Sequence, residues 1–114
     1  MQNKVEVTTK ELIIKPQGIN KITALKSKLV IALDHVQGAS LDEGILNDYK
    51  GIREPGTTLP GYWAGTFKND GEKTFFNVSR KDKPVVIQLK DEDYTRLVLG
   101  VENPEELVNE LNNI

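Results

Sequence analysis

The sequence contains no cysteine, and this absence excludes several kinds of chemistry at once. A chain without thiols forms no disulfide bond, no thiolate metal site and no cysteine nucleophile. Its single histidine, His35, is accompanied by no nucleophile-elbow pattern, so a structural role at the corner after a strand is favoured over a serine–histidine catalytic arrangement. We therefore expect no catalytic residue and no enzyme activity.

The loops that bind metals or phosphates in other proteins are also missing. Asp91, Glu92 and Asp93 lie too close together for a calcium loop, and the glycine and final glutamate of such a loop are absent. Gly61 and Gly65 do not have the spacing of a phosphate-binding loop, and no Gly-Lys-Ser/Thr follows them. The sequence thus predicts neither a metal site nor a cofactor.

Long hydrophobic runs are absent too. No apolar run approaches the roughly 20 residues that span a bilayer, and the first residues contain no apolar signal region. The net charge of −2 gives little bulk attraction to nucleic acid. We expect a cytoplasmic protein without a transmembrane segment or a nucleic-acid partner, whose membrane contact, if there is any, is peripheral at the inner face.

What the chain does contain is a series of short β-type segments, separated by turn signals about every ten residues. This pattern is typical of a barrel or a sandwich. We predict strands over Glu11–Lys15, Ile19–Lys26, Leu29–Leu33, Val36–Leu41, Tyr62–Lys68, Glu72–Ser79, Val85–Leu89 and Tyr94–Val101. Residues 42–48 are predicted as a loop or a single helical turn. The 114 residues are expected to form one domain, with residues 1–8 as a disordered N-terminal extension.

A hairpin is predicted around Asp70-Gly71, because a type I′ turn needs positive φ at both central positions. This two-residue turn sets the register, in which Gly65 lies opposite Phe76. One face, which we expect to point inward, then carries Trp63, Phe67, Phe76 and Val78. The same register places Lys68 opposite Lys73 on the outer face. A three-residue loop would separate the two lysines but would pair the apolar residues less cleanly.

The end of the chain changes to a helical period. Asn103 suits the N-cap, Pro104 suits the first helical position, and Glu105 and Glu106 meet the positive end of the helix dipole. Apolar residues then recur at helical spacing at Leu107, Val108, Leu111 and Ile114. A helix of about eleven residues is too short to be stable alone, so we predict that it docks on the strands.

The most distinctive segment is Gly51–Phe67, which holds four of the nine glycines, two of the five prolines and the only tryptophan. We predict that its first part is a long loop whose path the glycines and prolines restrict. Together with Val85–Leu89 and Tyr94–Leu107, this segment resembles a family of small bacterial pleckstrin-homology-like (PH-like) domains of uncharacterised function. The resemblance runs from about residue 9 to the end of the chain, and Pro55–Gly61 and Ala64–Phe67 are its most specific pieces.

The resemblance implies a PH-like barrel of about seven antiparallel strands, capped at one open end by the C-terminal helix. It also implies a bacterial cytoplasmic or membrane-associated setting, and it brings no catalytic residues. We predict a non-enzymatic binding module that recognises a protein or peptide, or that associates with itself. Residues suited to such a contact lie in and after the long loop, at Arg53, Leu59 and Tyr62. An exposed sheet edge near Val36–Leu41 is the other candidate surface, where a partner strand could add.

A second hypothesis is weak peripheral binding to anionic lipid through basic residues near the first strands, at Lys15, Lys21, Lys26 and Lys28. Lipid-binding PH domains use basic residues on the first two strands and the loop between them, and Lys15 and Lys26 loosely resemble that spacing. Arginine is more usual there, and Lys28 falls in the following turn. Each lysine near an anionic surface contributes about 1 kcal/mol. A third hypothesis, an enzyme with an unrecognised site, requires a cleft of convergent polar groups with perturbed pKa values.

Overall fold

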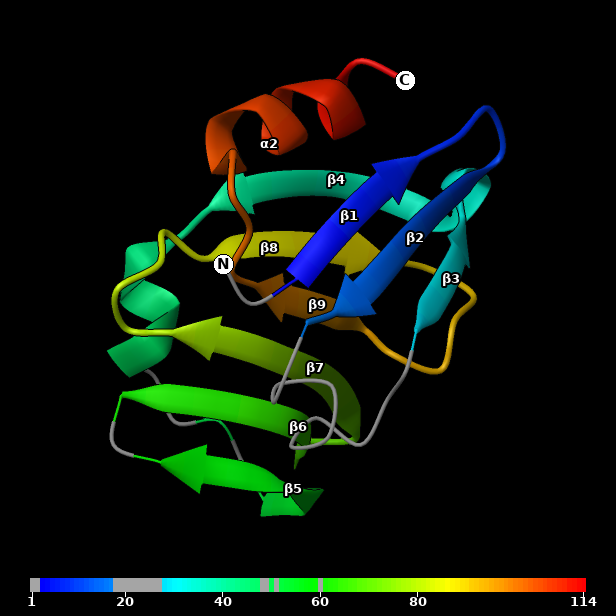
Figure 1. Ribbon diagram of the computed structural model, residues 1–114. Helices are drawn as coiled ribbons and strands as arrows, with labels where there is room; N and C mark the ends of the chain where they lie inside the picture. Colours follow the sequence, from blue (N-terminus) through cyan, green and yellow to red (C-terminus); the bar gives the residue numbers. More distant parts are fainter. Residues whose placement is uncertain (1–2, 18–27, 48–49, 51, 60) are drawn as a thin grey trace.

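The computed structural model describes residues 3–17, 28–47, 50, 52–59 and 61–114, and it describes their side chains except over 52–59 (Figure 1). In chain order the elements are β1 (Asn3–Val7), β2 (Glu11–Pro16), β3 (Leu29–Ala32), the 3-10 helix η1 (Leu33–His35), β4 (Val36–Leu41), the 3-10 helix η2 (Glu43–Asn47), β5 (Ile52–Leu59), β6 (Tyr62–Asn69), β7 (Glu72–Ser79), β8 (Val85–Leu89), β9 (Arg96–Leu99) and the helix α2 (Pro104–Asn112). The predicted strand over Ile19–Lys26 lies outside the described residues. Each of the other predicted strands has a counterpart in the structure. Residues 42–48 were predicted as a loop or a single helical turn, and Glu43–Asn47 form the helical alternative, η2.

The strands β1, β2 and β3 form a three-stranded antiparallel sheet with β2 in the middle. The prediction of a disordered N-terminal extension is wrong, because residues 3–7 pair with β2 along their length. Val5 and Val7 pack against the main core. Lys4 and Glu6 alternate with them and face outward, since successive side chains of a strand point to opposite faces.

The other six described strands form one sheet in the order β4-β8-β9-β7-β6-β5. β9 lies between β8 and β7, antiparallel to β8 and parallel to β7. The expectation of uniformly antiparallel strands is therefore wrong at the β7–β9 pair. Because β7 and β8 run in opposite directions, a strand inserted between them must run parallel to one of them. No ladder among the described strands joins the two sheets into a closed barrel.

The hairpin of β6 and β7 has the predicted two-residue turn and the predicted register. The turn residues Asp70-Gly71 have φ angles of 53° and 81°, both positive as a type I′ turn requires. Gly65 lies opposite Phe76, and Lys68 lies opposite Lys73. Gly65 has a φ of 129°, which residues with a side chain rarely adopt, so glycine is required at this position.

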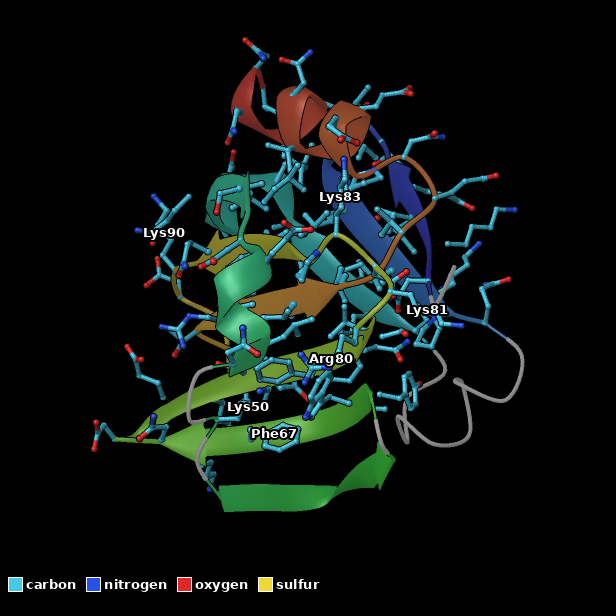
Figure 2. The ribbon with its side chains drawn as sticks, turned by 90° about the vertical axis from the view of Figure 1, so that its left-hand side faces the viewer. Lys50, Phe67, Arg80, Lys81, Lys83 and Lys90 are labelled. Atoms are coloured by element: carbon cyan, nitrogen blue, oxygen red, sulfur yellow. The ribbon has the colours of Figure 1, made fainter. Side chains whose placement is uncertain are left out.

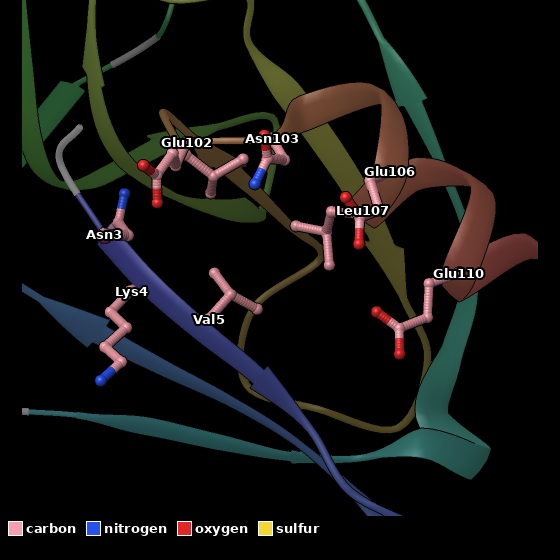
Figure 3. Close-up of a pocket in the computed structure, with 9 residues that line it drawn as sticks. Asn3, Lys4, Val5, Glu102, Asn103, Glu106, Leu107 and Glu110 are labelled. Carbon is pink, nitrogen blue, oxygen red and sulfur yellow. The ribbon is translucent and has the colours of Figure 1, made fainter.

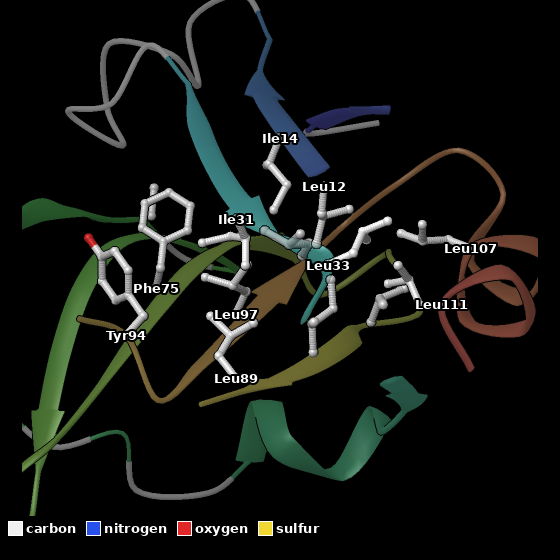
Figure 4. Packing of buried hydrophobic residues seen from close by; sticks show 14 residues of the cluster. Leu12, Ile14, Ile31, Leu33, Phe75, Leu89, Tyr94, Leu97, Leu107 and Leu111 are labelled. Atoms are coloured by element: carbon white, nitrogen blue, oxygen red, sulfur yellow. The ribbon is translucent and has the colours of Figure 1, made fainter. Parts of the chain in front are cut away.

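β7 is buried on both of its faces, which the sequence pattern did not predict. One face directs Phe75 into the main core, which fills the space between the two sheets and α2 (Figure 4). The face that we predicted as inward, with Phe67 and Phe76, belongs to a second apolar cluster instead. Leu46 of η2 covers that cluster. The predicted face is therefore buried, but on the side of the sheet away from the main core.

The first part of the glycine-rich segment forms an edge strand, β5, and not the long loop that we predicted. β5 pairs antiparallel with β6, with a shift in register between Arg53 and Gly56. Pro55 lies within this irregular part, as expected for a proline, which is confined to edge strands and bulges. Gly56 lies opposite Gly65, so two residues without side chains are neighbours across the ladder. The composition that suggested a loop instead allows an irregular strand at the edge.

The predicted C-terminal helix is confirmed as α2, which has Pro104 in its first turn. Leu107 and Leu111 are buried and dock the helix on the main core. The helix ends before Ile114, which is 67% exposed and takes no part in the docking. Asn103 stands at the N-cap position without a capping hydrogen bond from its side chain.

A buried polar network joins the start of β1 to the larger sheet. Asn3 Nδ2 donates to the carbonyl oxygens of Asn77 and Gly100, at 2.9 Å in each case. Asn77 Nδ2 donates to Asn3 Oδ1 at 2.8 Å, and the Tyr62 hydroxyl donates to Asn77 Oδ1 at 2.6 Å. Asn3 and Asn77 are 1% and 0% exposed, so these bonds replace water for both amides. The network fixes β1 beside the end of β9.

Candidate functional site

The edges of the sheets are where this fold leaves backbone hydrogen-bonding groups for a partner. The two described sheets end in the strands β1 and β3, and in β4 and β5. An edge strand presents a row of N–H and C=O groups that another strand can pair with, unless something covers them. The four edges differ in what lies beside them.

The predicted edge at Val36–Leu41 is β4, and α2 covers its middle. Asn112 Oδ1 accepts a hydrogen bond from Ala39 N, and Asn112 Nδ2 donates one to Ala39 O, both at 2.8 Å. These two bonds imitate the pairing of a neighbouring strand at this residue. Strand addition to β4 is therefore disfavoured, because Asn112 already occupies the groups that a partner strand would use.

The edge of β1 is more accessible. Asn3 N points away from β2 and donates to Gly100 O at 3.1 Å. Because backbone groups alternate in direction along a strand, Val5 and Val7 present their N–H and C=O on this same side. In the described part of the chain, no backbone hydrogen bond beyond the β1–β2 ladder occupies these groups. The outer edge of β1 is thus closed at Asn3 and open from Val5 onward.

A groove of about 260 Å³ runs between this edge and α2 (Figure 3). Its apolar part is formed by Val5, Val101 and Leu107. Pockets for small molecules usually measure about 300–1,000 Å³, so the groove is small for a complete ligand of that kind. It suits a few residues of an extended chain that continues beyond it.

The wall of the groove on the side of α2 is acidic. Glu106 and Glu110 point from α2 toward β1, and Glu102 lies near the start of β1 (Figure 3). All three glutamates are exposed, and none of them has an ion-pair partner among the described side chains. Lys4 also lines the groove but points away from α2 (Figure 3). The lining residues therefore carry a formal charge of −2, three glutamates against one lysine.

A second pocket, of about 210 Å³, lies between η2 and the hairpin. Its charged lining residues are Lys50, Glu72 and Arg96, and Arg96 donates to Glu72 Oε1 at 2.9 Å and to Thr74 Oγ1 at 3.0 Å. Glu72 therefore neutralises the charge of Arg96 within the chain. The pocket therefore presents less unbalanced charge to a ligand than the groove beside β1.

The three residues predicted to contact a partner do not gather at the groove. Arg53 and Leu59 lie on β5, where the backbone is described and the side chains are not. Tyr62 is half-buried, packs against the main core and donates its hydroxyl proton to Asn77. Its contacts give it a structural role, while partner contact by Arg53 and Leu59 stays a prediction.

The lysines of the lipid hypothesis are only partly described. Lys15 Nζ lies 2.9 Å from Glu6 Oε1, and this hydrogen bond, with the charge of Lys15, lowers the pKa of the Glu6 carboxyl below its ordinary value. Lys28 is exposed, and Lys21 and Lys26 lie outside the described residues. Lys15 is therefore neutralised in part by its neighbour, which weakens its attraction to an anionic surface.

Sequence reasoning also missed a contact between cations and an aromatic ring on β6. Lys50 Nζ lies 4.6 Å and Arg80 Cζ lies 5.1 Å from the centroid of the Trp63 ring, and Figure 2 labels both cations on this side. Lys50 also donates to Leu46 O at 2.7 Å, and Arg80 donates to Asn47 Oδ1 at 3.3 Å. Both cations thus attach η2 to the hairpin, and Trp63 stabilises them through its ring face.

His35 contributes to the structure of the corner before β4. Its Nδ1 lies 2.5 Å from Glu92 Oε2, and its carbonyl accepts from Lys90 N at 2.9 Å. Over the residues that the structure describes, no three histidine, aspartate or glutamate side chains come together as metal ligands. The helices in that same part of the chain are all too short or too polar to cross a membrane.

These features define a class of protein, namely a small, mainly β domain of two sheets whose C-terminal helix packs beside an open strand edge. The chain belongs to the bacterial PH domain family, whose model matches residues 6–114. The family resemblance seen in the sequence is thereby confirmed. No curated protein matches the chain, and no solved structure does. PH domains are in general non-catalytic binding modules, and membership of this family suggests a binding module for the chain.

Proposed function

We propose that this protein is a non-enzymatic module that binds an extended segment of another protein by strand addition. In this mode of recognition, main-chain hydrogen bonds supply affinity, and contacts to alternate side chains supply specificity. The observation that carries the proposal is the outer edge of β1, where Val5 lines the groove beside α2 and the outward backbone groups of Val5 and Val7 take part in no described backbone hydrogen bond. The covered edge of β4 supports the choice of β1 over the edge favoured by the sequence.

Selection from a library of random linear peptides displayed on phage tests the proposal. Peptides are expected to be enriched on the full chain, and a synthetic copy of the most enriched one is expected to bind Val5→Pro about tenfold more weakly. Proline removes the outward N–H, whose hydrogen bond contributes about 0.5–1.5 kcal/mol, and it is tolerated in an edge strand. Isothermal titration calorimetry measures the affinity, and circular dichroism verifies that the variant is folded.

Two further variants make this test decisive. Val7→Pro removes the next outward N–H and replaces Val5→Pro if that variant does not fold. Asn112→Ala uncovers β4 and leaves β1 unchanged, so it is expected to bind the peptide as the wild-type chain does. A selection that enriches no peptide, or affinities that both proline variants leave unchanged, would contradict strand addition at β1.

Self-association and lipid binding are distinguishable outcomes of the same work. Dimerisation of the wild-type chain in analytical ultracentrifugation, abolished by Val5→Pro, would make a second copy of the chain the partner. Sedimentation with vesicles of phosphatidylglycerol and phosphatidylethanolamine, lost when the four predicted lysines become glutamine, would support the lipid hypothesis instead. The expected cytoplasmic location stays a prediction, as does the expectation that any membrane contact is peripheral and at the inner face.

A further inference from the structure

We infer that the groove between β1 and α2 selects a basic segment, with lysine or arginine at alternate positions of the added strand. The inference rests on the proposed function and adds to it the chemistry of the partner. Three properties of the groove carry it, namely its backbone edge, its apolar floor and its acidic wall.

The backbone edge sets the length and the position of the segment. The bond from Asn3 N to Gly100 O ends the available edge on one side. The outward groups of Val5 and Val7 remain, so the groove pairs with only a few residues of the partner. Such a short ladder gives little affinity by itself, and side-chain contacts must supply the rest of the selectivity.

The apolar floor and the acidic wall lie on the same side of an added strand, the side toward α2 to which Val5 points (Figure 3). Side chains on that side would cover Val5 and Leu107 with their stems, which favours residues with a long apolar stem. Their head groups would then meet Glu106 and Glu110. Because side chains of a strand alternate, lysine or arginine is expected at every second position of the partner, and the side chains between them point away from α2, as Lys4 does.

The negative charges of α2 that face the groove favour a cation there. Glu106 and Glu110 are four residues apart, so they are neighbours on one face of the helix and repel each other. Glu105, by contrast, is paired with Lys83 at 2.8 Å on another part of the surface. A lysine or arginine between Glu106 and Glu110 would relieve their repulsion and gain a charge-assisted hydrogen bond. An acidic segment would add to the repulsion.

Sequencing of the peptides selected on the wild-type chain gives the first test. Lysine and arginine are expected to be enriched at alternate positions over the unselected library. The double variant Glu106→Gln/Glu110→Gln is then expected to bind the synthetic peptide about threefold to tenfold more weakly, since exposed charge pairs contribute modestly. The difference is expected to shrink at high salt, which screens exposed charges.

Glu105→Gln is the control, because it makes the same kind of substitution on the same helix, with the loss of one negative charge and not two, away from the groove. It is expected to leave the affinity unchanged. Enrichment of neutral or acidic peptides, or equal affinity for the wild-type chain and the Glu106→Gln/Glu110→Gln variant, would overturn the inference. If those peptides still lose affinity with Val5→Pro, strand addition stands and only the basic specificity fails. If no peptide is enriched, both fail.

Discussion

Replacing Phe75 by alanine is expected to lower the free energy of unfolding by about 3–5 kcal/mol, the usual range for a buried phenylalanine. Phe75 is 0% exposed, and its ring meets that of Tyr94 edge to face, with centroids 5.8 Å apart. Alanine would leave a cavity in the main core and would remove this aromatic contact. Urea unfolding followed by circular dichroism measures the change.

Phe75→Ala distinguishes the observed orientation of the β6–β7 hairpin from the predicted one, in which the face with Phe67 and Phe76 points into the main core. If Phe67 and Phe76 faced the only core, Phe75 would be exposed and its truncation would change the stability by less than about 0.5 kcal/mol. Val30→Ala is the control, since Val30 is 43% exposed on β3 and its truncation is expected to have such a small effect. A small effect of Phe75→Ala would contradict the arrangement of the two apolar clusters.

Replacing Asn77 by leucine is expected to destabilise the chain by about 2–4 kcal/mol, because buried polar groups that lose a partner cost about 1–3 kcal/mol each. Leucine has the same number and branching of side-chain heavy atoms as asparagine and is somewhat larger, so the substitution removes hydrogen bonds without opening a cavity. Asn3 Oδ1 loses its donor at 2.8 Å, and the Tyr62 hydroxyl loses an acceptor at 2.6 Å. Thermal and urea unfolding measure the loss.

A double-mutant cycle of Asn3→Ala and Asn77→Ala separates the network from general packing. The two substitutions are expected to be non-additive by at least about 0.5 kcal/mol, because the side chains bond directly to each other. Additive effects would mean that the pair does not couple β1 to the larger sheet. The cycle also bears on function, since these residues position the edge of β1.

The hairpin and the helix were predictable because their signals are local. The turn at Asp70-Gly71 fixes the register of β6 and β7 within a few residues. The spacing of Leu107 and Leu111 marks the buried side of α2 in the same way. Family membership was also predictable, because the glycine-rich segment has an unusual composition.

The groove was not predictable, because it depends on contacts between the two ends of the chain. β1 is a short strand of mixed polarity, and only its pairing with β2 and the network around Asn3 show that it is ordered. Glu105 and Glu106 were interpreted as the start of a helix, and nothing in the sequence indicated that a strand edge lies beside Glu106 and Glu110. The burial of β7 on both faces depends in the same way on η2, which comes from a distant segment.

Hydrogen exchange at β1, measured by NMR on the full chain with and without the selected peptide, tests the central claim most directly. In the chain alone, the amides of Val5 and Val7 are expected to exchange much faster than those of Lys4 and Glu6, which point toward β2. Addition of the peptide is expected to slow Val5 and Val7 and to leave Ala39 unchanged. Slow exchange at Val5 in the chain alone, or protection that develops on β5 and not on β1, would contradict the account.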